Sequence, residues 1–176
     1  MTARHCSGVN TVWSQGGSTL GVTAAKNNGG SFDAQLITTA GYRNNWGRVH
    51  KTFADDAHAV TFGCTSGHDL LNKTVCQTGA KTTCSSGNCN LFARCALVTS
   101  LSFRPPSYGD APYAAAFGWA DYLNDHGDSG AAVYWSTGYG FGAAGIHGGG
   151  YAGGYGAYFS RFSVIAAAWG LSVSPY

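Results

Sequence analysis

This chain of 176 residues carries few charges, since Asp, Glu, Lys and Arg make up 10% of it and the net charge is +2. The charges are scattered and form no basic patch or basic amphipathic segment, so we expect neither a nucleic acid nor a membrane as a partner. No apolar run approaches the ~18 residues of a membrane span. The hydrophobic content of 44% is ample for the core of one domain or of two small lobes.

The cysteine and glycine contents indicate a compartment and a kind of fold. The chain has 6 Cys, 1 Met, 27 Gly and 4 Pro. This composition predicts an exported protein with disulfides and with many short strands joined by tight turns, although the opening stretch MTARHC contains no signal segment. A structural zinc site is the alternative use of the cysteines. Their spacing lacks the close pairs of zinc ribbons and fingers.

Short strands are predicted along most of the chain. Segments that mix β-branched and apolar residues lie between clusters of Gly or Asn. The first of these segments are residues 19–25, 34–39 and 48–53, and the pattern continues to residue 150. Segment 91–103 is long enough for a helix, but its Val, Thr and Phe residues favour a long strand or a hairpin arm.

The C-terminal part of the chain combines strands, a loop and a helix. Strands are predicted at residues 130–135 and 142–147, and the glycine-rich stretch 148–156 predicts a flexible loop. In segment 158–169 apolar residues recur at intervals of three and four, and Gly170 follows as a stop signal. We therefore expect a short C-terminal helix packed on a barrel.

Three polar residues, far apart in the sequence, are candidate catalytic groups. His5 lies in TARHC, Asp33 precedes the apolar stretch AQLI, and Ser129 lies in HGDSG. Each alone fits a structural role, because a single histidine is more often structural, an aspartate before a strand is usually a turn residue, and GDSG fits a hairpin turn. Together they supply the nucleophile, the base and the orienting carboxylate that an activated serine requires.

The motifs around these residues resemble those of chymotrypsin-like serine proteases. TARHC is similar to the family's TAxHC and HGDSGAA is similar to its GDSGG, in the family's order of His, Asp and Ser. The short interval from His5 to Asp33, the stretch VCQTGAKTTC and the end of the chain resemble the bacterial alpha-lytic protease and streptogrisin group. The resemblance extends from His5 to Val173.

The resemblance implies a role for each candidate residue. Ser129 would attack the scissile carbonyl, His5 would accept its proton and later give it to the leaving amine, and Asp33 would hold the imidazole tautomer. The backbone N–H groups of Gly127 and Ser129 would form the oxyanion hole. Such a site acts on a protein or peptide and needs neither a metal nor an organic cofactor.

The implied fold class is all-β, with two Greek-key six-stranded β-barrels and a short C-terminal helix. We expect the N-terminal barrel lobe in residues 1–60, the C-terminal lobe in residues 61–176, and the active site between them. Family members have a hairpin and a strand before the TAxHC loop, so the first barrel is expected to be incomplete and the chain to be N-terminally truncated. We also expect a secreted monomer with a pro-segment outside this chain.

Two departures from the family pattern concern the turn that carries Ser129. Ala131 replaces the second Gly of GDSGG. Gln77 stands where the alpha-lytic group has an arginine that neutralises the buried aspartate of the motif, here Asp128. An unpaired buried carboxylate is strongly destabilising. We therefore expect either Arg94 or a network of neutral groups beside Asp128.

The cysteines depart from the family pattern as well. The usual upstream partner of Cys6 is absent, so Cys6 is expected to be free. Six cysteines allow many pairings, and the sequence does not choose among them. We expect Cys76 to pair with Cys84 or Cys89, which leaves Cys64 and Cys95 for a second bridge.

A further resemblance concerns substrate preference. The stretch GIHGGG is similar to the pocket strand of glutamyl endopeptidases. It implies that His147, Gly148 and Gly149 bind the side chain before the cut, and His126 is expected to add a second donor to a glutamate carboxylate. The alternative is a core histidine at position 147 and a pocket for an apolar or small residue.

The sequence thus predicts a secreted serine endopeptidase that hydrolyses peptide bonds through an acyl-enzyme, with glutamate as the suggested preference. Two alternatives remain. One is a non-catalytic homologue that keeps the fold and binds a peptide or another surface ligand. The other is an unrelated Gly- and Tyr-rich β-sandwich lectin or wall protein, indicated by the aromatic content of 14%.

Overall fold

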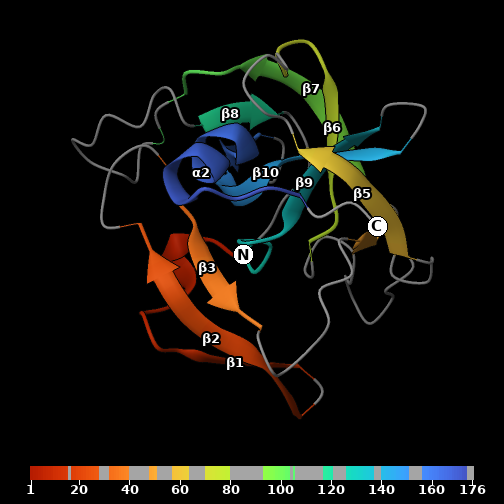
Figure 1. Ribbon diagram of the computed structural model, residues 1–176. Coiled ribbons are helices and arrows are strands. Elements are labelled where there is room, and N and C mark those ends of the chain that lie inside the picture. Colours follow the sequence, from red (N-terminus) through yellow and green to blue (C-terminus); the bar gives the residue numbers. More distant parts are fainter. Residues whose placement is uncertain are drawn as a thin grey trace.

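The computed structural model is built mainly from β-strands, and it confirms the all-β fold class (Figure 1). It describes residues 1–15, 17–27, 32–39, 48–50, 57–63, 70–79, 93–103, 105, 117–120, 126–136, 140–150 and 156–173. Of the helices in these residues, none has the length and apolar character needed to cross a membrane.

The N-terminal part is a three-stranded antiparallel sheet preceded by one turn of 3-10 helix. Its elements are η1 (Arg4–Cys6), β1 (Val12–Gln15), β2 (Ser18–Lys26) and β3 (Gln35–Thr38), with the strands in the order β1-β2-β3. Both strand pairs contain a register shift, which bends and twists the sheet. This curled sheet corresponds to the incomplete first barrel that the sequence predicts.

Six strands of the described residues close into the second barrel. In their order around it they are β6 (Thr74–Gln77), β7 (Arg94–Ser100), β8 (Phe117–Ala120), β11 (Ala157–Arg161), β10 (Phe141–Gly150) and β9 (Ala132–Ser136). All neighbours are antiparallel, and the β10–β11 pairing completes the circle. The predicted six-stranded C-terminal barrel is therefore confirmed.

A hairpin from the middle of the chain extends the barrel sheet. It consists of β4 (Arg48–His50) and β5 (Ala57–Gly63). β5 pairs in parallel with the beginning of β10, where Val60 lies opposite Phe141. The lobe boundary expected between residues 60 and 61 thus falls inside β5, and the division of the chain into two lobes stays a prediction.

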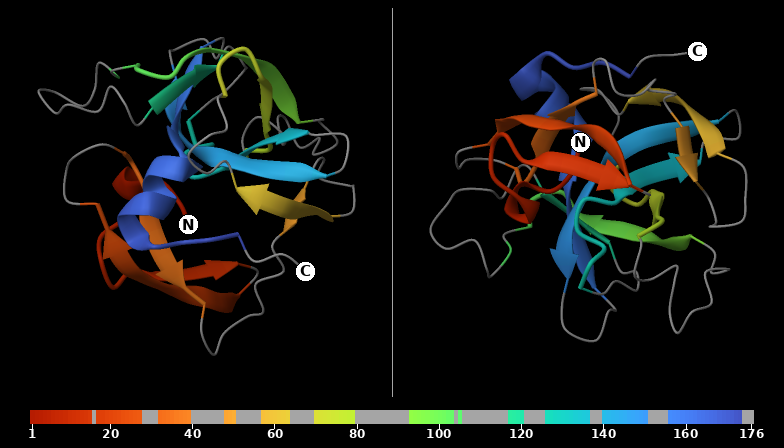
Figure 2. Two further views of the ribbon diagram at one scale, coloured as in Figure 1. Left: turned by 45° about the horizontal axis from the view of Figure 1, so that its top comes forward. Right: turned by 90° about the horizontal axis from the view of Figure 1, so that it is seen from below.

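Buried side chains form one core inside the barrel and a second core between the barrel and the N-terminal sheet. The barrel core consists of Leu70, Val75, Val98, Val133, Ala144, Ala157 and Phe159. The second core consists of Ala3, Phe32, Ala34, Ile146, Tyr158 and Ile165. Figures 1 and 2 show the α-helix, α2 (Phe162–Trp169), beside this junction. There Trp169 packs edge-on against Phe32 at a centroid distance of 5.2 Å.

The C-terminal helix begins later than the sequence predicts. Residues 158–161 belong to β11, and α2 starts at Phe162. The prediction was wrong because the apolar periodicity of a buried strand cannot be told from that of a buried helix, and residues 157–160 are all buried between β8 and β10. The predicted stop is confirmed, since Gly170 has a φ of 63° and its N–H donates to the Ala166 carbonyl.

The other predicted elements agree with the structure where it describes them. The predicted strands at residues 19–25 and 34–39 correspond to β2 and β3, and residues 48–50 of the predicted strand 48–53 form β4. Segment 91–103 contains β7, a strand of seven residues, as expected. The predicted loop at 148–156 is only partly correct, because β10 continues to Gly150 and residues 151–155 lie outside the described residues.

Candidate active site

The structure brings together the three side chains that the sequence singles out as catalytic. Nδ1 of His5 lies 2.6 Å from Asp33 Oδ2, and Nε2 of the same ring lies 2.9 Å from Ser129 Oγ. The Asp33 side chain is fully buried, whereas that of His5 is 43% exposed. The imidazole therefore links a buried carboxylate to a partly exposed hydroxyl.

The two partners of the imidazole determine which ring nitrogen carries the proton. An ionised carboxylate only accepts hydrogen bonds, so Nδ1 of His5 must donate to Asp33. Nε2 of the neutral ring is then the acceptor for the Ser129 hydroxyl. The other carboxylate oxygen, Oδ1, accepts the backbone N–H of His5 at 3.2 Å. In this arrangement the ring can take a proton from Ser129 without reorienting.

Backbone contacts fix η1 against the start of β3. Thr2 and Gln35 exchange two backbone hydrogen bonds of 3.1 and 2.8 Å. Gln35 lies two residues after Asp33, so this pair holds η1 beside the carboxylate. Ala3, the residue before η1, is completely buried. The position of His5 thus depends on packing at the junction of the two parts of the molecule.

Ser129 lies in a tight turn, residues 126–130, that leads into β9. The N–H of Ala131 donates to the Asp128 carbonyl at 3.0 Å, and the N–H of Gly130 donates to the His147 carbonyl at 2.9 Å. Gly127 has a φ of 107°, a conformation that favours glycine. The N–H groups expected to form the oxyanion hole, those of Gly127 and Ser129, donate to no backbone carbonyl among the described residues. The role of these two groups as an oxyanion hole stays a prediction.

The turn accommodates both Ala131 and the buried Asp128. The carbonyl of Ala131 accepts the His147 N–H at 2.9 Å, so this residue is bonded to β10 just before β9 begins. Asp128 is buried with 1% of its surface exposed. Gly79 lies so close to the Asp128 carboxylate that a Cβ atom at position 79 would clash with it.

Arg94, one of the two expected neighbours of Asp128, is on β7 opposite Gln77 of β6. Within the part of the chain that the structure describes, it forms no ion pair with Asp128. The expectation of a neutral network beside Asp128 stays a prediction.

His147 lies on β10 and is buried, with 1% of its surface exposed. Burial is the main reason that the pKa of His147 is lowered to about 4. The nearby Asp128 and Asp33 carboxylates act in the opposite direction, and His5 adds to the lowering. At neutral pH the ring is therefore uncharged, and it can donate one hydrogen bond but cannot offer a positive charge.

The other three residues expected to bind substrate differ in exposure. His126 is exposed at the start of the Ser129 turn. Gly148 and Gly149 follow the buried histidine along β10, and the Tyr158 ring lies directly against both. Because Tyr158 fills the space that side chains at these positions would need, this stretch of β10 presents backbone only.

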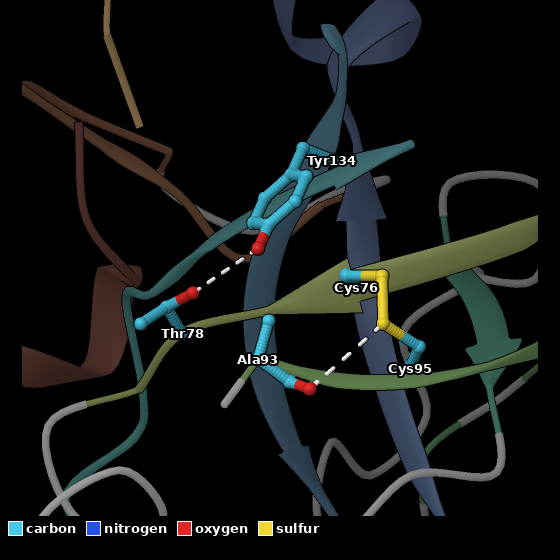
Figure 3. Close-up of a disulfide and its surroundings, with 5 residues drawn as sticks. All are labelled: Cys76, Thr78, Ala93, Cys95 and Tyr134. Atoms are coloured by element: carbon cyan, nitrogen blue, oxygen red, sulfur yellow. Dashed lines mark hydrogen bonds between the residues drawn. A yellow bond between two sulfur atoms is a disulfide. The ribbon is translucent and has the colours of Figure 1, made fainter. Parts of the chain in front are cut away.

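The expected pairing of Cys76 with Cys84 or Cys89 is wrong, because Cys76 forms a disulfide with Cys95 (Figure 3). The two cysteines lie directly opposite each other in the antiparallel pair of β6 and β7. Such cross-strand neighbours are close enough to be bridged, whatever their separation in sequence. Cys64, Cys84 and Cys89 lie outside the described residues.

Cys6 is free and exposed, as expected from the sequence. Its thiol lies 3.8 Å from the Ser129 carbonyl oxygen. Partial burial is the main cause that raises the pKa of the Cys6 thiol, and the nearby Asp33 carboxylate raises it further. The thiol is therefore protonated at neutral pH and is not a competing nucleophile.

The sequence analysis missed two residues that contact this site. Ser160 on β11 makes hydrogen bonds to the backbone of Asp33, and Gly79 packs against Asp128. A serine at the end of the apolar and aromatic stretch AYF was a usable signal for the first. Gly79 lies in the stretch VCQTGAKTTC, but nothing there indicated that it contacts Asp128, which lies 49 positions along the chain.

Comparison with known proteins supports the fold. No protein-family model and no curated protein sequence matches the chain. The structure of Cellulomonas bogoriensis chymotrypsin is similar, at 21% identity over 99% of this chain and 85% of that one, with a TM-score of 0.75. A glutamic-acid-specific serine protease that uses a histidine triad in substrate binding is similar at 21% identity, over 98% and 84% of the two chains, with a TM-score of 0.76.

These similarities do not single out the alpha-lytic protease and streptogrisin group, so that narrower relationship stays a prediction. The alternative of a β-sandwich lectin is wrong, because the strands form a closed barrel and a curled sheet. The chain has the double β-barrel fold of chymotrypsin-like serine proteases, with a three-stranded sheet as its first barrel in the described residues.

Proposed function

We propose that this protein is a secreted serine endopeptidase that cleaves peptide bonds through an acyl-enzyme. The observation that carries the proposal is the continuous series of contacts from the buried Asp33 carboxylate through the His5 ring to Ser129 Oγ. The serine proteases among the similar structures support the same reaction class. The Cys76–Cys95 disulfide supports a location outside the reducing cytosol.

In the proposed reaction, Ser129 Oγ attacks the scissile carbonyl carbon while its proton moves to Nε2 of His5. Asp33 stabilises the imidazolium through the short hydrogen bond to Nδ1. The Gly127 and Ser129 amides stabilise the negative oxygen of the tetrahedral intermediate. The imidazolium then protonates the leaving amine, and a water molecule, activated by the same ring, hydrolyses the ester.

Hydrolysis of a general peptide substrate, with the product peptides identified by mass spectrometry, tests the proposal. Ser129→Ala and His5→Ala should each lower kcat by about four to six powers of ten, and Asp33→Asn by about four. The rate should rise as the pH increases through the range in which a histidine loses its proton. A folded wild-type protein that binds peptide but does not cleave it would instead support the non-catalytic homologue.

We further propose that the protein prefers glutamate before the cut. His147 supports this preference as a neutral hydrogen-bond donor in a buried site, because its lowered pKa of about 4 leaves the ring uncharged. A carboxylate that enters beside it would also favour proton uptake by the ring. One of the similar structures is a glutamic-acid-specific serine protease, and this similarity supports the proposed preference.

Profiling with peptide libraries tests this preference. Wild-type protein should enrich Glu before the cleaved bond, and His147→Ala should remove the enrichment while it retains cleavage of other bonds. His126→Ala, profiled in the same way, tests whether the exposed His126 adds a second hydrogen-bond donor for the glutamate side chain. Equal cleavage after Glu and after apolar residues in the wild type would contradict the preference and leave the endopeptidase proposal intact.

A further inference from the structure

We infer that Ser160 is a positioning residue for the proposed triad, one that sets the location of Asp33 relative to Ser129. This inference rests on the proposed function. The backbone N–H of Asp33 donates to Ser160 Oγ at 2.8 Å, and the Ser160 hydroxyl donates to the Asp33 carbonyl at 3.3 Å. One side chain thus satisfies both backbone groups of the residue that orients the base.

The contact is buried and joins distant parts of the chain. Asp33 is 1% exposed, Ser160 is 0% exposed, and the two are 127 positions apart in sequence. Asp33 precedes β3 in the N-terminal sheet, whereas Ser160 lies on β11 of the barrel. No water can replace the hydroxyl without entering the core, so loss of this side chain would leave buried backbone groups of Asp33 without these two bonds.

Two neighbouring residues of β10 connect this contact to the nucleophile. Ser160 is the strand partner of Ile146. The carbonyl of the next residue, His147, accepts the N–H of Gly130, which follows Ser129. The strand partner of Ser160 and the residue that accepts the Gly130 N–H are therefore consecutive on β10. The paired strands β10 and β11 thus link the support of Asp33 to that of Ser129.

The hydroxyl binds the backbone of Asp33, while the side chain of Asp33 contacts His5. Both Asp33 carboxylate oxygens contact His5, through Nδ1 and through the backbone N–H. If Ser160 were absent, the buried N–H and carbonyl of Asp33 would lack these partners, and the segment would shift to recover them. A shift of that kind misaligns the base, and errors of about 1 Å can cost about a hundredfold in rate.

The test compares Ser160→Ala and Ser160→Thr with wild-type protein and with Ser163→Ala, a half-buried serine on α2. Steady-state peptide hydrolysis gives kcat and KM. Proton NMR gives the His5 Nδ1–H signal, which reports the short bond to Asp33 and is assigned by its loss in His5→Ala. The indole N–H of Trp13, bonded to Thr23 Oγ1 at 2.8 Å, reports the folding of the N-terminal sheet.

We expect Ser160→Ala to lower kcat by about tenfold to a hundredfold with little change in KM, and to shift or broaden the His5 signal while the Trp13 signal persists. Ser160→Thr, which keeps the hydroxyl, should restore both, and Ser163→Ala should match the wild type. If Ser160→Ala does not fold, Ser160→Cys replaces it, since a thiol has similar size and bonds weakly.

The readouts separate this inference from the proposed function. A wild type that cleaves peptides, together with a Ser160→Ala variant of unchanged kcat and unchanged His5 signal, would overturn the positioning role and leave the endopeptidase in place. A folded wild type that does not cleave peptides, but whose His5 signal changes in Ser160→Ala, would contradict the endopeptidase proposal and support the positioning of Asp33 by Ser160. A lowered kcat with an unchanged His5 signal would also overturn the positioning role.

Discussion

At the scale of single residues, the site depends on buried polar groups whose surroundings leave little freedom. Asp33, Asp128, His147 and Ser160 are all nearly or completely buried. Buried polar groups are costly unless they are partnered, so each of them restricts its neighbours. Asp128 restricts position 79 to glycine, and burial keeps the His147 ring uncharged at neutral pH.

Gly79→Ala should lower the proposed peptide hydrolysis strongly, while Gly8→Ala should not. A Cβ atom at position 79 would clash with the Asp128 carboxylate, which belongs to the turn that presents Ser129. We expect kcat to fall by at least about a hundredfold, since displacing one oxyanion-hole donor alone has that effect. Position 8 has open space around a Cβ atom and serves as the matched control. Peptide hydrolysis by both variants measures the difference, and a fully active Gly79→Ala would show that Asp128 can move without consequence.

The burial of His147 should make the protein less stable in acid. Its pKa of about 4 lies below the ordinary value of 6.5, so below about pH 6.5 the unfolded chain takes up a proton that the folded chain refuses. The contribution of the neutral ring is complete above that pH and is lost as the pH falls towards about 4. Each pH unit in this range costs about 1.4 kcal/mol.

The comparison of His147→Gln with the wild type isolates this contribution from that of the carboxylates. Between pH 7 and pH 5 the wild type should lose about 2 kcal/mol more of its free energy of unfolding than the variant. Urea unfolding at the two pH values measures both losses. Equal losses would mean that His147 is protonated in the folded protein or is not buried.

At the scale of the elements, strands with an alternating or β-branched pattern were easier to predict than the strand at residues 158–161, whose apolar spacing resembles that of a helix. β2, β3 and β7 follow from β-branched runs between turn residues, because helices and loops rarely show that pattern. Residues 158–161 form a strand although they continue the helical spacing of α2, since pairing with β8 and β10 decided the outcome. The register of β6 and β7, which determines the disulfide, is a tertiary property that no local pattern contains.

Loss of the Cys76–Cys95 bridge should destabilise the β6–β7 hairpin without stopping catalysis. The bridge spans 19 positions, and closing a loop of that size in the unfolded chain corresponds to about 3 kcal/mol. We expect the double variant Cys76→Ala with Cys95→Ala to lose about that much free energy of unfolding, and reductant to lower the wild type to the same level. Cys6→Ala, which removes a free thiol, is the control. Equal stability of all three proteins would contradict the bridge.

At the scale of the whole molecule, the candidate triad is assembled where the N-terminal sheet meets the barrel. His5 and Asp33 come from the sheet side, while Ser129 and Ser160 come from the barrel side. TARHC and GDSG are local signatures that predicted His5 and Ser129, and Asp33 was predicted from its place before the apolar stretch AQLI. Ser160 and Gly79 contribute through contacts formed only on folding, so the sequence could mark Ser160 as an unusual serine but could not indicate what either residue contacts.

The most direct test of the central claim is mass spectrometry of the protein after exposure to a fluorophosphonate, which reacts with a serine that its surroundings activate. We expect a single adduct, located by peptide mapping on Ser129 and absent from His5→Ala. Protein shown by circular dichroism to be folded, yet without an adduct on Ser129, would contradict the claim that His5 and Asp33 activate this serine.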